Sequence, residues 1–315
     1  KYISRSKEEE GEYFFTFAEK ICRFVNSLGK TAIMWSDIVR DYPDRLNTFP
    51  RDVVMANWLY SHVAGDELIK LVHDAGCVQY VAPSTCSYGR FSENLDFSIG
   101  NIINLADYGY RWGAKGFVNT NWGDSGNPNT WELSMYSLAL GAQKAWNVRL
   151  HNGFNDAMNL LIYKHPRGVE RLVSLNELHR PLGWFAFVNA AHKFYYEVIK
   201  NEGSEINGFF GEGTCDKLYG FNEEVLSYIQ AAYSEYIKTF PEDFVGEYAD
   251  EMLIAAEGVC VMAELFAKMS GIKCVRLTDT AAWLEKFNTK WCEKNKPVWY
   301  DKINDVFNWI ENAKI

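Results

Sequence analysis

The stretch KGFVNTNWGDSGNPNTW, residues 115–131, is the most informative about the fold. Its short apolar run, GFV at residues 116–118, passes through the polar triplet NTN and stops at WGD, residues 122–124. A loop rich in Gly, Asn and Pro follows. This pattern is typical of a buried parallel strand, and ligands of α/β proteins bind at the carboxyl ends of such strands. We therefore expect Trp122 and Asp124 to face a site.

An indole beside a carboxylate is well suited to binding a carbohydrate. The ring stacks on the apolar C–H face of a sugar, and the carboxylate accepts hydrogen bonds from hydroxyl groups. The alternative is that Trp122 belongs to the core and Asp124 only caps the following turn.

The same pattern recurs in three earlier apolar runs: residues 31–35 (TAIMW), 52–58 (DVVMANW) and 77–82 (CVQYVA). At or beyond their ends lie Trp35 and Asp37, then Asn57 and Trp58, then residues 84–88 with Tyr88 and Arg90. A barrel gathers successive strand ends around one mouth, so these side chains predict an aromatic-walled pocket with one or two carboxylates at its floor. The alternative, in which each Trp fills a layer inside the barrel, stays open.

Helical segments separate the runs. Ser6 and Glu9 form a capping box for a helix that Gly29 ends, residues 65–75 and 98–112 have helical periodicity, and Asn129 with Glu132 predicts an N-cap. Strands that alternate with helices indicate an α/β protein with a parallel sheet. The spacing fits (β/α) units, of which about 250 residues make eight. Residues 1–147 are therefore predicted to be the second half of a (β/α)8 TIM-type barrel, strands 5 to 8.

Residues 148–315 are predicted to form a helical C-terminal domain. Helices are expected near residues 154–163 and 184–199, then at 223–240, 244–269 and 281–293, with a last helix to the end. Asn222 and either Thr278 or Thr280 are the expected N-caps. The Gly-rich residues 203–213 do not have the spacing of a phosphate-binding loop.

The composition and net charge of the chain indicate which classes of macromolecule it binds poorly. The chain has 315 residues, 48% of them hydrophobic, and 32 Lys plus Arg against 41 Asp plus Glu, a net charge of −9. This balance argues against nucleic acid or an anionic membrane as a partner. No apolar run reaches the roughly 20 residues of a membrane span.

Seven cysteines, an odd number without a C-x-x-C pair or a matching His cluster, indicate free thiols in a reducing, cytoplasmic compartment. We expect neither a metal nor another cofactor. The start at Lys1 has no signal-peptide pattern and no initiator Met, and is interpreted as a mature or truncated end.

The order MWSD, VVMANW, the Tyr88 region and GFVNTNWGD with a following AWN resembles the second half of the catalytic barrel of family 20 glycoside hydrolases, the β-N-acetylhexosaminidases. The resemblance covers residues 9–147, and the late WCEKNKP is similar to a segment in the helical tails of some members. It implies a glycosidase that removes terminal N-acetylhexosamine, GlcNAc or GalNAc, with the acetamide oxygen of the sugar as nucleophile.

The resemblance also implies roles for single residues. Trp35, Trp58 and Trp122 correspond to the tryptophans that wall the acetamide pocket and floor the sugar. Asp124 corresponds to the carboxylate that holds ring hydroxyls. Tyr88 corresponds to the tyrosine that bonds the acetamide oxygen, although STCSYGR departs from the usual Tyr-x-Asp.

The catalytic Asp-Glu pair of that family has no counterpart in this chain and is expected before Lys1. The two Asp-Glu pairs present, Asp66-Glu67 and Asp250-Glu251, are interpreted as solvated carboxylates in first helical turns or on the surface. The chain alone is therefore expected to bind sugar without hydrolysing it.

Two alternatives stay open. One is a different barrel glycosidase with Asp37 and Asp124 as the working pair, which requires carboxyl groups about 5 to 9.5 Å apart. The other is a non-catalytic sugar-binding or assembly module. Expected partners are a carbohydrate with terminal N-acetylhexosamine and either the N-terminal barrel half or a second copy of the chain, because half a barrel leaves unpaired strand edges.

Overall fold

The computed structural model describes residues 6–149, 152–196, 214–298 and 300–313. The chain divides into two compact units. Unit 1 comprises Lys1–Thr85, Asp96–Thr120 and Ser137–Leu150, and unit 2 comprises Cys86–Leu95, Asn121–Tyr136 and His151–Ile315. The predicted division of the chain after residue 147 remains a prediction.

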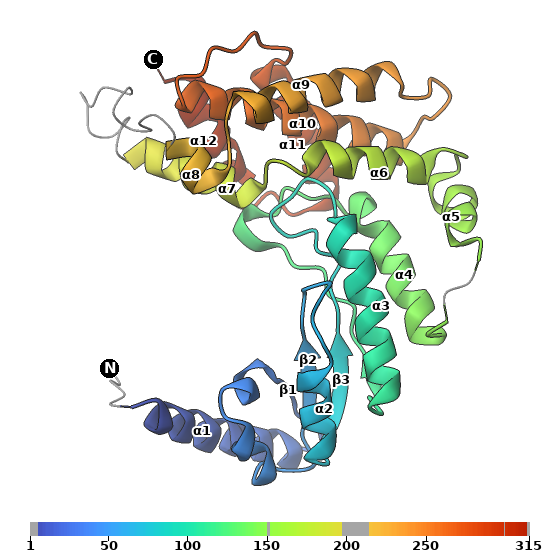
Figure 1. Cartoon of the computed structure of the whole chain (residues 1–315), viewed down its shortest axis with the longest axis vertical. Helices are drawn as coiled ribbons and strands as arrows, with labels where there is room; N and C mark the ends of the chain where they lie inside the picture. Colours follow the sequence, from blue (N-terminus) through green and yellow to red (C-terminus); the bar gives the residue numbers. More distant parts are fainter. Residues whose placement is uncertain (1–5, 150–151, 197–213, 299, 314–315) are drawn as a thin grey trace. The chain divides into compact units, whose positions relative to one another are not determined.

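Unit 1 contains a parallel sheet (Figure 1). Its strands are β1 (Ile33–Trp35), β2 (Val54–Trp58), β3 (Val78–Ala82) and β4 (Gly116–Phe117), hydrogen-bonded in the order β1-β2-β3-β4. Every neighbouring pair is parallel, and an isolated parallel bridge joins Ser84 to Thr120 beyond β3 and β4. The predicted α/β class and the positions of all four strands are confirmed.

Helix α1 (Lys7–Ser27) precedes β1, the helices α2 (Glu67–Asp74) and α3 (Leu95–Arg111) lie between successive strands, and α4 (Met135–Trp146) follows β4. Two short 3-10 helices, η1 (Asp37–Arg40) and η2 (Pro43–Asn47), connect β1 to β2. The Ser6 side chain accepts a hydrogen bond from the Glu9 backbone N–H at 3.2 Å, so the predicted cap of α1 is confirmed. Gly29 has φ of 71°, the left-handed conformation that ends such a helix.

One face of the sheet carries a continuous core. Buried Val53 and Met55 pack there with residues from α1, η1, η2 and α2, among them Phe15, Leu46 and Val72. On the opposite face the register aligns Ile33 with Val54 and Val54 with Val78. Ile33 is 57% exposed and Val78 is 40% exposed. Unit 1 therefore has an apolar sheet face that is partly open.

Unit 2 is helical around α10 (Glu247–Met269). This helix is buried on nearly all sides because it packs against other helices of the unit. Those neighbours are α6 (Gly168–His179), α7 (Trp184–Phe194), α9 (Glu223–Lys238), α11 (Thr280–Lys294) and α12 (Tyr300–Glu311) (Figure 1). The remaining elements are η3 (Asp124–Gly126), η4 (Trp131–Ser134), α5 (Phe154–Ala157), the π-helix η5 (Met158–Tyr163) and α8 (Thr214–Tyr219).

The predicted caps of unit 2 have mixed outcomes. Asn222 caps α9 as predicted, because its side chain accepts from the Val225 N–H at 3.0 Å. Neither Thr278 nor Thr280 caps α11. Asp279 does, because both threonine hydroxyls bond to the distant carboxylates Glu264 and Glu311.

The predicted N-cap at Asn129 is also wrong. Its buried side chain donates to the Phe91 carbonyl at 3.1 Å and accepts from the Ser134 hydroxyl at 2.8 Å. The segment begins instead as the 3-10 helix η4 after Thr130. The Gly-rich residues 203–213 lie outside the described residues.

No helix within the described ranges combines the length and the apolar character needed to cross a membrane.

Candidate functional site

Two indoles stand at the carboxyl ends of adjacent strands in unit 1. Trp35 is the last residue of β1 and pairs with Ala56, two residues before Trp58 at the end of β2. Because side chains alternate along a strand, Trp35 and Trp58 lie on the same face of the sheet. Trp35 is 40% exposed and Trp58 is half-buried. The two predicted wall residues of this unit are therefore on one surface.

The Trp58 indole is held in place by polar and aromatic neighbours. Its Nε1–H donates to the Asp37 carboxylate at 3.1 Å, and the Arg40 guanidinium lies 5.9 Å from the ring. The Tyr60 ring is 5.0 Å away, and its hydroxyl accepts from Thr120 at 3.3 Å. A buried hydrogen bond to a charged group is worth roughly 1.5–3 kcal/mol, and less where water competes. Trp58 thus offers a fixed aromatic surface, and Asp37 is committed to positioning it.

Asn57 does not face the mouth, contrary to the prediction. It is fully buried, accepts from the Ser36 hydroxyl at 2.6 Å and donates to the Gln79 side chain at 2.7 Å. The reason is the strand alternation, which sends Asn57 to the face opposite Trp58. Asn57 and Gln79 therefore belong to a buried hydrogen-bonded group that joins neighbouring strands on that face.

In unit 2, Tyr88 lies on a tightly turned loop. Cys86 is buried with φ of 51°, and Gly89 has φ of 63°. A Cβ on Gly89 would fall 2.3 Å from the Phe185 ring, and the Gly89 carbonyl accepts from the Trp184 N–H at 3.2 Å. Cys86 is not a glycine, so its left-handed conformation stores strain of order 1–3 kcal/mol. Strained backbone of this kind is common at functional sites. Helix α7 thus fixes the backbone around Tyr88.

Trp122 and Asp124 lie on a second loop of unit 2. Trp122 is 39% exposed, so it is not buried in the core of unit 2. Asp124 is exposed and begins η3. The Trp291 indole of α11 donates to the Asn127 carbonyl at 3.0 Å, which anchors the loop to the helical bundle.

The two loops of unit 2 are also joined to each other. The Ser87 hydroxyl donates to the Asn121 side chain, which links the residue before Tyr88 to the residue before Trp122. The predicted site residues thus fall into a pair in unit 1 and a group of three in unit 2. That all five line one pocket remains a prediction.

The two Asp-Glu pairs differ from each other in burial. Asp66 accepts from the Trp112 indole at 2.7 Å and from Arg111 at 2.9 Å, and its pKa is lowered chiefly by the Trp112 bond. Glu251 is only 2% exposed, and burial raises its pKa to about 7. The expectation of solvated carboxylates is therefore wrong for Glu251, because tertiary packing covers it. Asp66 lies partly exposed at the N-terminus of α2, as expected.

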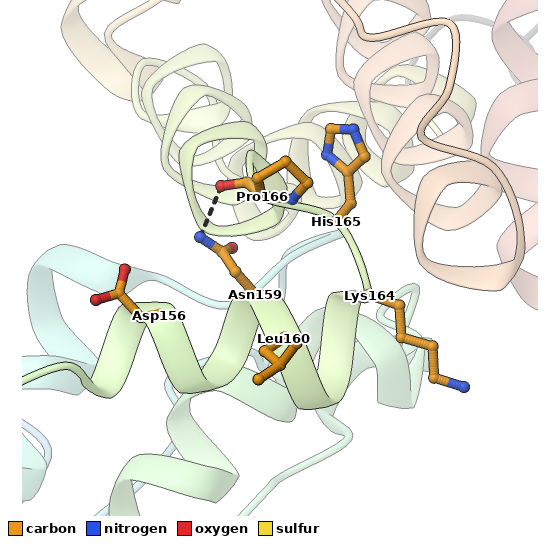
Figure 2. A pocket seen from close by; sticks show the side chains of 6 residues that line it. All are labelled: Asp156, Asn159, Leu160, Lys164, His165 and Pro166. Atoms are coloured by element: carbon orange, nitrogen blue, oxygen red, sulfur yellow. Dashed lines mark hydrogen bonds between the residues drawn. The ribbon is translucent and has the colours of Figure 1, made fainter.

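A cavity of about 470 Å³ opens elsewhere in unit 2 (Figure 2). It is lined by Asp156, Asn159, Leu160, Lys164, His165 and Pro166, and contains no predicted site residue. The π-helix η5 forms one wall and ends at Lys164, which has φ of 53°. No sequence motif marked this cavity.

His165 in this cavity has a structural role. Its Nδ1 accepts from the Arg167 N–H at 3.1 Å, its Nε2 lies 3.3 Å from the Asp243 carboxylate, and its ring stacks on Phe244 at 4.6 Å. Both ring nitrogens are engaged, so His165 is not placed as a free catalytic base.

Within the described part of the chain, no three His, Cys, Asp or Glu side chains are grouped to hold a metal ion. The chain matches no protein-family model, and no curated protein matches it.

Proposed function

We propose that this chain is part of a glycoside hydrolase that removes terminal N-acetylhexosamine, β-GlcNAc or β-GalNAc, by substrate-assisted catalysis. The observation that carries the proposal is the pair Trp35 and Trp58 on one face of a parallel sheet, at adjacent strand ends, with the second indole fixed by Asp37. Two indoles on a common face suit the flat acetamide group and its methyl, which plain hexoses lack. A sugar site is therefore favoured over an unspecific apolar surface.

The proposed architecture is the second half of a (β/α)8 barrel, strands 5 to 8. Four parallel strands in chain order, with a continuous core on one face, support it. The opposite face, with exposed Ile33 and Val78, corresponds to the surface that lines a barrel interior. Closing such a barrel requires four further strands, from an N-terminal half or from another copy.

Each unit has its own part in the proposed binding. In unit 1 the acetamide lies between Trp35 and Trp58. In unit 2 the exposed Trp122 stacks on the apolar face of the sugar, the exposed Asp124 accepts hydrogen bonds from ring hydroxyls, and Tyr88 donates to the acetamide oxygen. Exposure of Trp122 and Asp124 supports these roles because both side chains are accessible to a ligand.

The reaction fixes what the binding residues must do. The acetamide oxygen forms a bond to the anomeric carbon as the bond to the leaving oxygen breaks, and that oxygen takes a proton from a general acid. Water then opens the oxazolinium intermediate and regenerates the acetamide. Residues of this chain hold the acetamide in position for attack, and the Asp-Glu pair that orients it and donates the proton is placed before Lys1.

The hydrolysis test uses nitrophenyl N-acetyl-β-glucosaminide with the chain alone and with the preceding half added in cis or as a second polypeptide. General acid catalysis is worth typically 10²–10⁴-fold, so the chain alone is expected to show no substantial turnover. Restoration by the added half supports the proposal. Substantial turnover by the chain alone would place the acid among its own carboxylates and overturn the placement before Lys1.

If turnover is restored, Asp124→Asn separates the two enzymatic alternatives. A hydroxyl-binding Asp124 predicts altered preference between gluco and galacto sugars. A change confined to one limb of the pH–rate profile, with preference intact, would favour Asp124 as an acid or base.

A binding test compares Trp122→Ala with Trp146→Ala. Trp146 is 93% exposed at the end of α4 and serves as a matched control for loss of an exposed indole. Sugar stacking worth about 1 kcal/mol predicts a roughly fivefold weaker affinity for N-acetylglucosamine in the first variant. Equal effects of the two substitutions would refute the role of Trp122.

A further inference from the structure

Helix α1 carries two apolar stripes where a helix on a sheet needs one. The inner stripe packs on the core of unit 1 through buried Phe15 and Cys22, with Ala18 and Val25 beside them. Gly11 adds close contact, because a Cβ there would lie 2.5 Å from the Tyr42 ring. These contacts fix the rotation of α1 about its axis.

The outer stripe consists of Phe14, Phe17, Ile21 and Phe24 together with Leu28, the residue that ends the helix, and these side chains are 43% to 66% exposed. Their spacing is three, four, three and four residues, the repeat by which one helix packs against another helix. Single exposed apolar residues are common on proteins, but a continuous stripe along seven-residue repeats marks an interaction surface. The inner stripe prevents α1 from turning this surface inward.

We propose that the outer stripe is a self-association surface, on which α1 of a second copy of this chain packs antiparallel. In that arrangement Phe14 lies against the partner's Leu28, Phe17 lies against the partner's Phe24, and Ile21 meets the partner's Ile21 at the two-fold axis. The pairing is isologous, as most dimer interfaces are. It stands independently of the proposed function.

Charge complementarity selects the antiparallel direction. The amino end of α1 is acidic, with Glu8, Glu9 and Glu10 in its first turn. Glu10 continues the outer stripe one step before Phe14, and exposed Lys30 lies two residues beyond Leu28. An antiparallel partner brings its Lys30 near Glu10 and also opposes the helix dipoles, whereas a parallel partner would align the acidic turns.

The area is sufficient for a dimer of modest affinity. A large aromatic or apolar side chain offers on the order of 150–250 Å², so five that are about half exposed contribute roughly 500 Å² per copy. Tyr13, which is 57% exposed beside the stripe, adds to this. The two copies together approach the roughly 1,200 Å² at the lower limit of stable interfaces.

The first test measures mass by light scattering over a concentration series, with the whole chain. The expected result is a shift with concentration from 36.2 kDa toward twice that mass. The double variant Phe17→Glu/Phe24→Glu should remain at 36.2 kDa while retaining its circular dichroism, because both side chains point away from the core.

The matched control, Leu161→Glu/Val245→Glu, also replaces two exposed apolar side chains with glutamate, but away from α1. Both residues are strongly exposed, at 68% and 78%, but belong to unit 2. This control should dimerise as the wild type does. A wild-type chain that stays monomeric at all concentrations, or a dimer that the α1 variant leaves intact, would overturn the proposal.

A second test does not depend on disrupting the stripe. In a Cys292→Ser background, which removes the exposed native thiol, Ile21→Cys should form an intermolecular disulfide and Phe14→Cys should form much less. In the antiparallel pairing, residue 21 of one copy lies next to residue 21 of the other, whereas the two residues at position 14 lie far apart. A parallel pairing would bring both positions next to their equivalents. Equal crosslinking at both positions, or none at position 21, would refute this geometry.

Discussion

Replacing Glu251 with Gln is predicted to make the protein more stable at pH 8 while leaving its stability near pH 4 almost unchanged. Glu251 lies on α10 with 2% exposure, and burial raises its pKa to about 7 from 4.5. Nearby Glu132 raises the pKa further, while the adjacent Thr130 hydroxyl and the charge of Lys290 act in the opposite direction. The carboxyl group is therefore neutral in the folded protein over a range in which the unfolded chain has lost the proton.

The sign and size follow from proton binding. Between about pH 4.5 and pH 7 the folded state holds a proton that the unfolded state has released, so the free energy of unfolding falls as the pH rises. The difference between a pKa of about 7 in the folded protein and 4.5 in the unfolded chain, at 1.36 kcal/mol per pH unit, gives a loss of about 3 kcal/mol, which is complete above pH 7. Gln has the same shape and no charge to desolvate, so the variant lacks this loss.

The assay is urea denaturation followed by tryptophan fluorescence at pH 4.5, 6, 7 and 8. The difference in unfolding free energy between Glu251→Gln and the wild type should grow by about 3 kcal/mol across this range. Asp250→Asn is the matched control, because Asp250 is the exposed neighbour on the same helix and pairs with Lys290 at 3.7 Å. A difference for Glu251→Gln that does not vary with pH would show that Glu251 does not hold its proton in the folded state over this range.

Three further outcomes are expected. Glu264→Ala should lower the unfolding free energy in urea by about 3–5 kcal/mol, since a fully covered carboxylate with several donors is removed, whereas Glu257→Ala, which loses a surface pair, should cost under about 1 kcal/mol. Gly258→Ala should lower the free energy of unfolding by roughly 1–3 kcal/mol in a thermal unfolding measurement, because the added Cβ would lie 2.6 Å from the Trp283 ring. Because the pKa of Asp66 is lowered, Asp66→Asn should be less stable than the wild type at pH 7, and a pH series should show the difference shrinking below about pH 4. Equal losses of stability for Glu264→Ala and Glu257→Ala would contradict the first expectation, and an unchanged stability of Gly258→Ala would contradict the second. A stability difference for Asp66→Asn that is constant with pH would contradict the third.

The strands and the first helix could be predicted because their signals are local. Short apolar runs between helical segments mark β1 to β4, and Ser6 and Gly29 mark the ends of α1 through backbone geometry that each residue itself favours. Helix α6 was not predicted. It is buried on several sides, so its sequence lacks the apolar periodicity of a surface helix.

Other features depend on partners far along the chain. Thr278 and Thr280 are good caps in isolation, but Glu264 and Glu311 take their hydroxyls, so Asp279 becomes the cap of α11. The burial of Glu251 arises only when the bundle assembles around α10. Such competition between local and distant partners cannot be read from spacing.

The sequence predicted where along the strands the candidate site residues lie better than it predicted the face of the sheet to which their side chains point. Trp35 and Trp58 end neighbouring strands as expected, and Trp122 is exposed as a ligand-facing residue should be. Asn57 could have been excluded from the mouth by strand alternation alone, since it precedes Trp58 by one residue.

Acetamide recognition by Trp35 and Trp58 is tested by a titration that compares N-acetylglucosamine with glucose, two sugars that differ only in the group at the second carbon. If Trp35 and Trp58 hold the acetamide, the chain binds N-acetylglucosamine at least about tenfold more tightly, a difference of about 1.4 kcal/mol. Trp58→Ala should abolish this preference, and Trp146→Ala should preserve it. Equal affinity for the two sugars, or a preference that survives Trp58→Ala, would contradict the account.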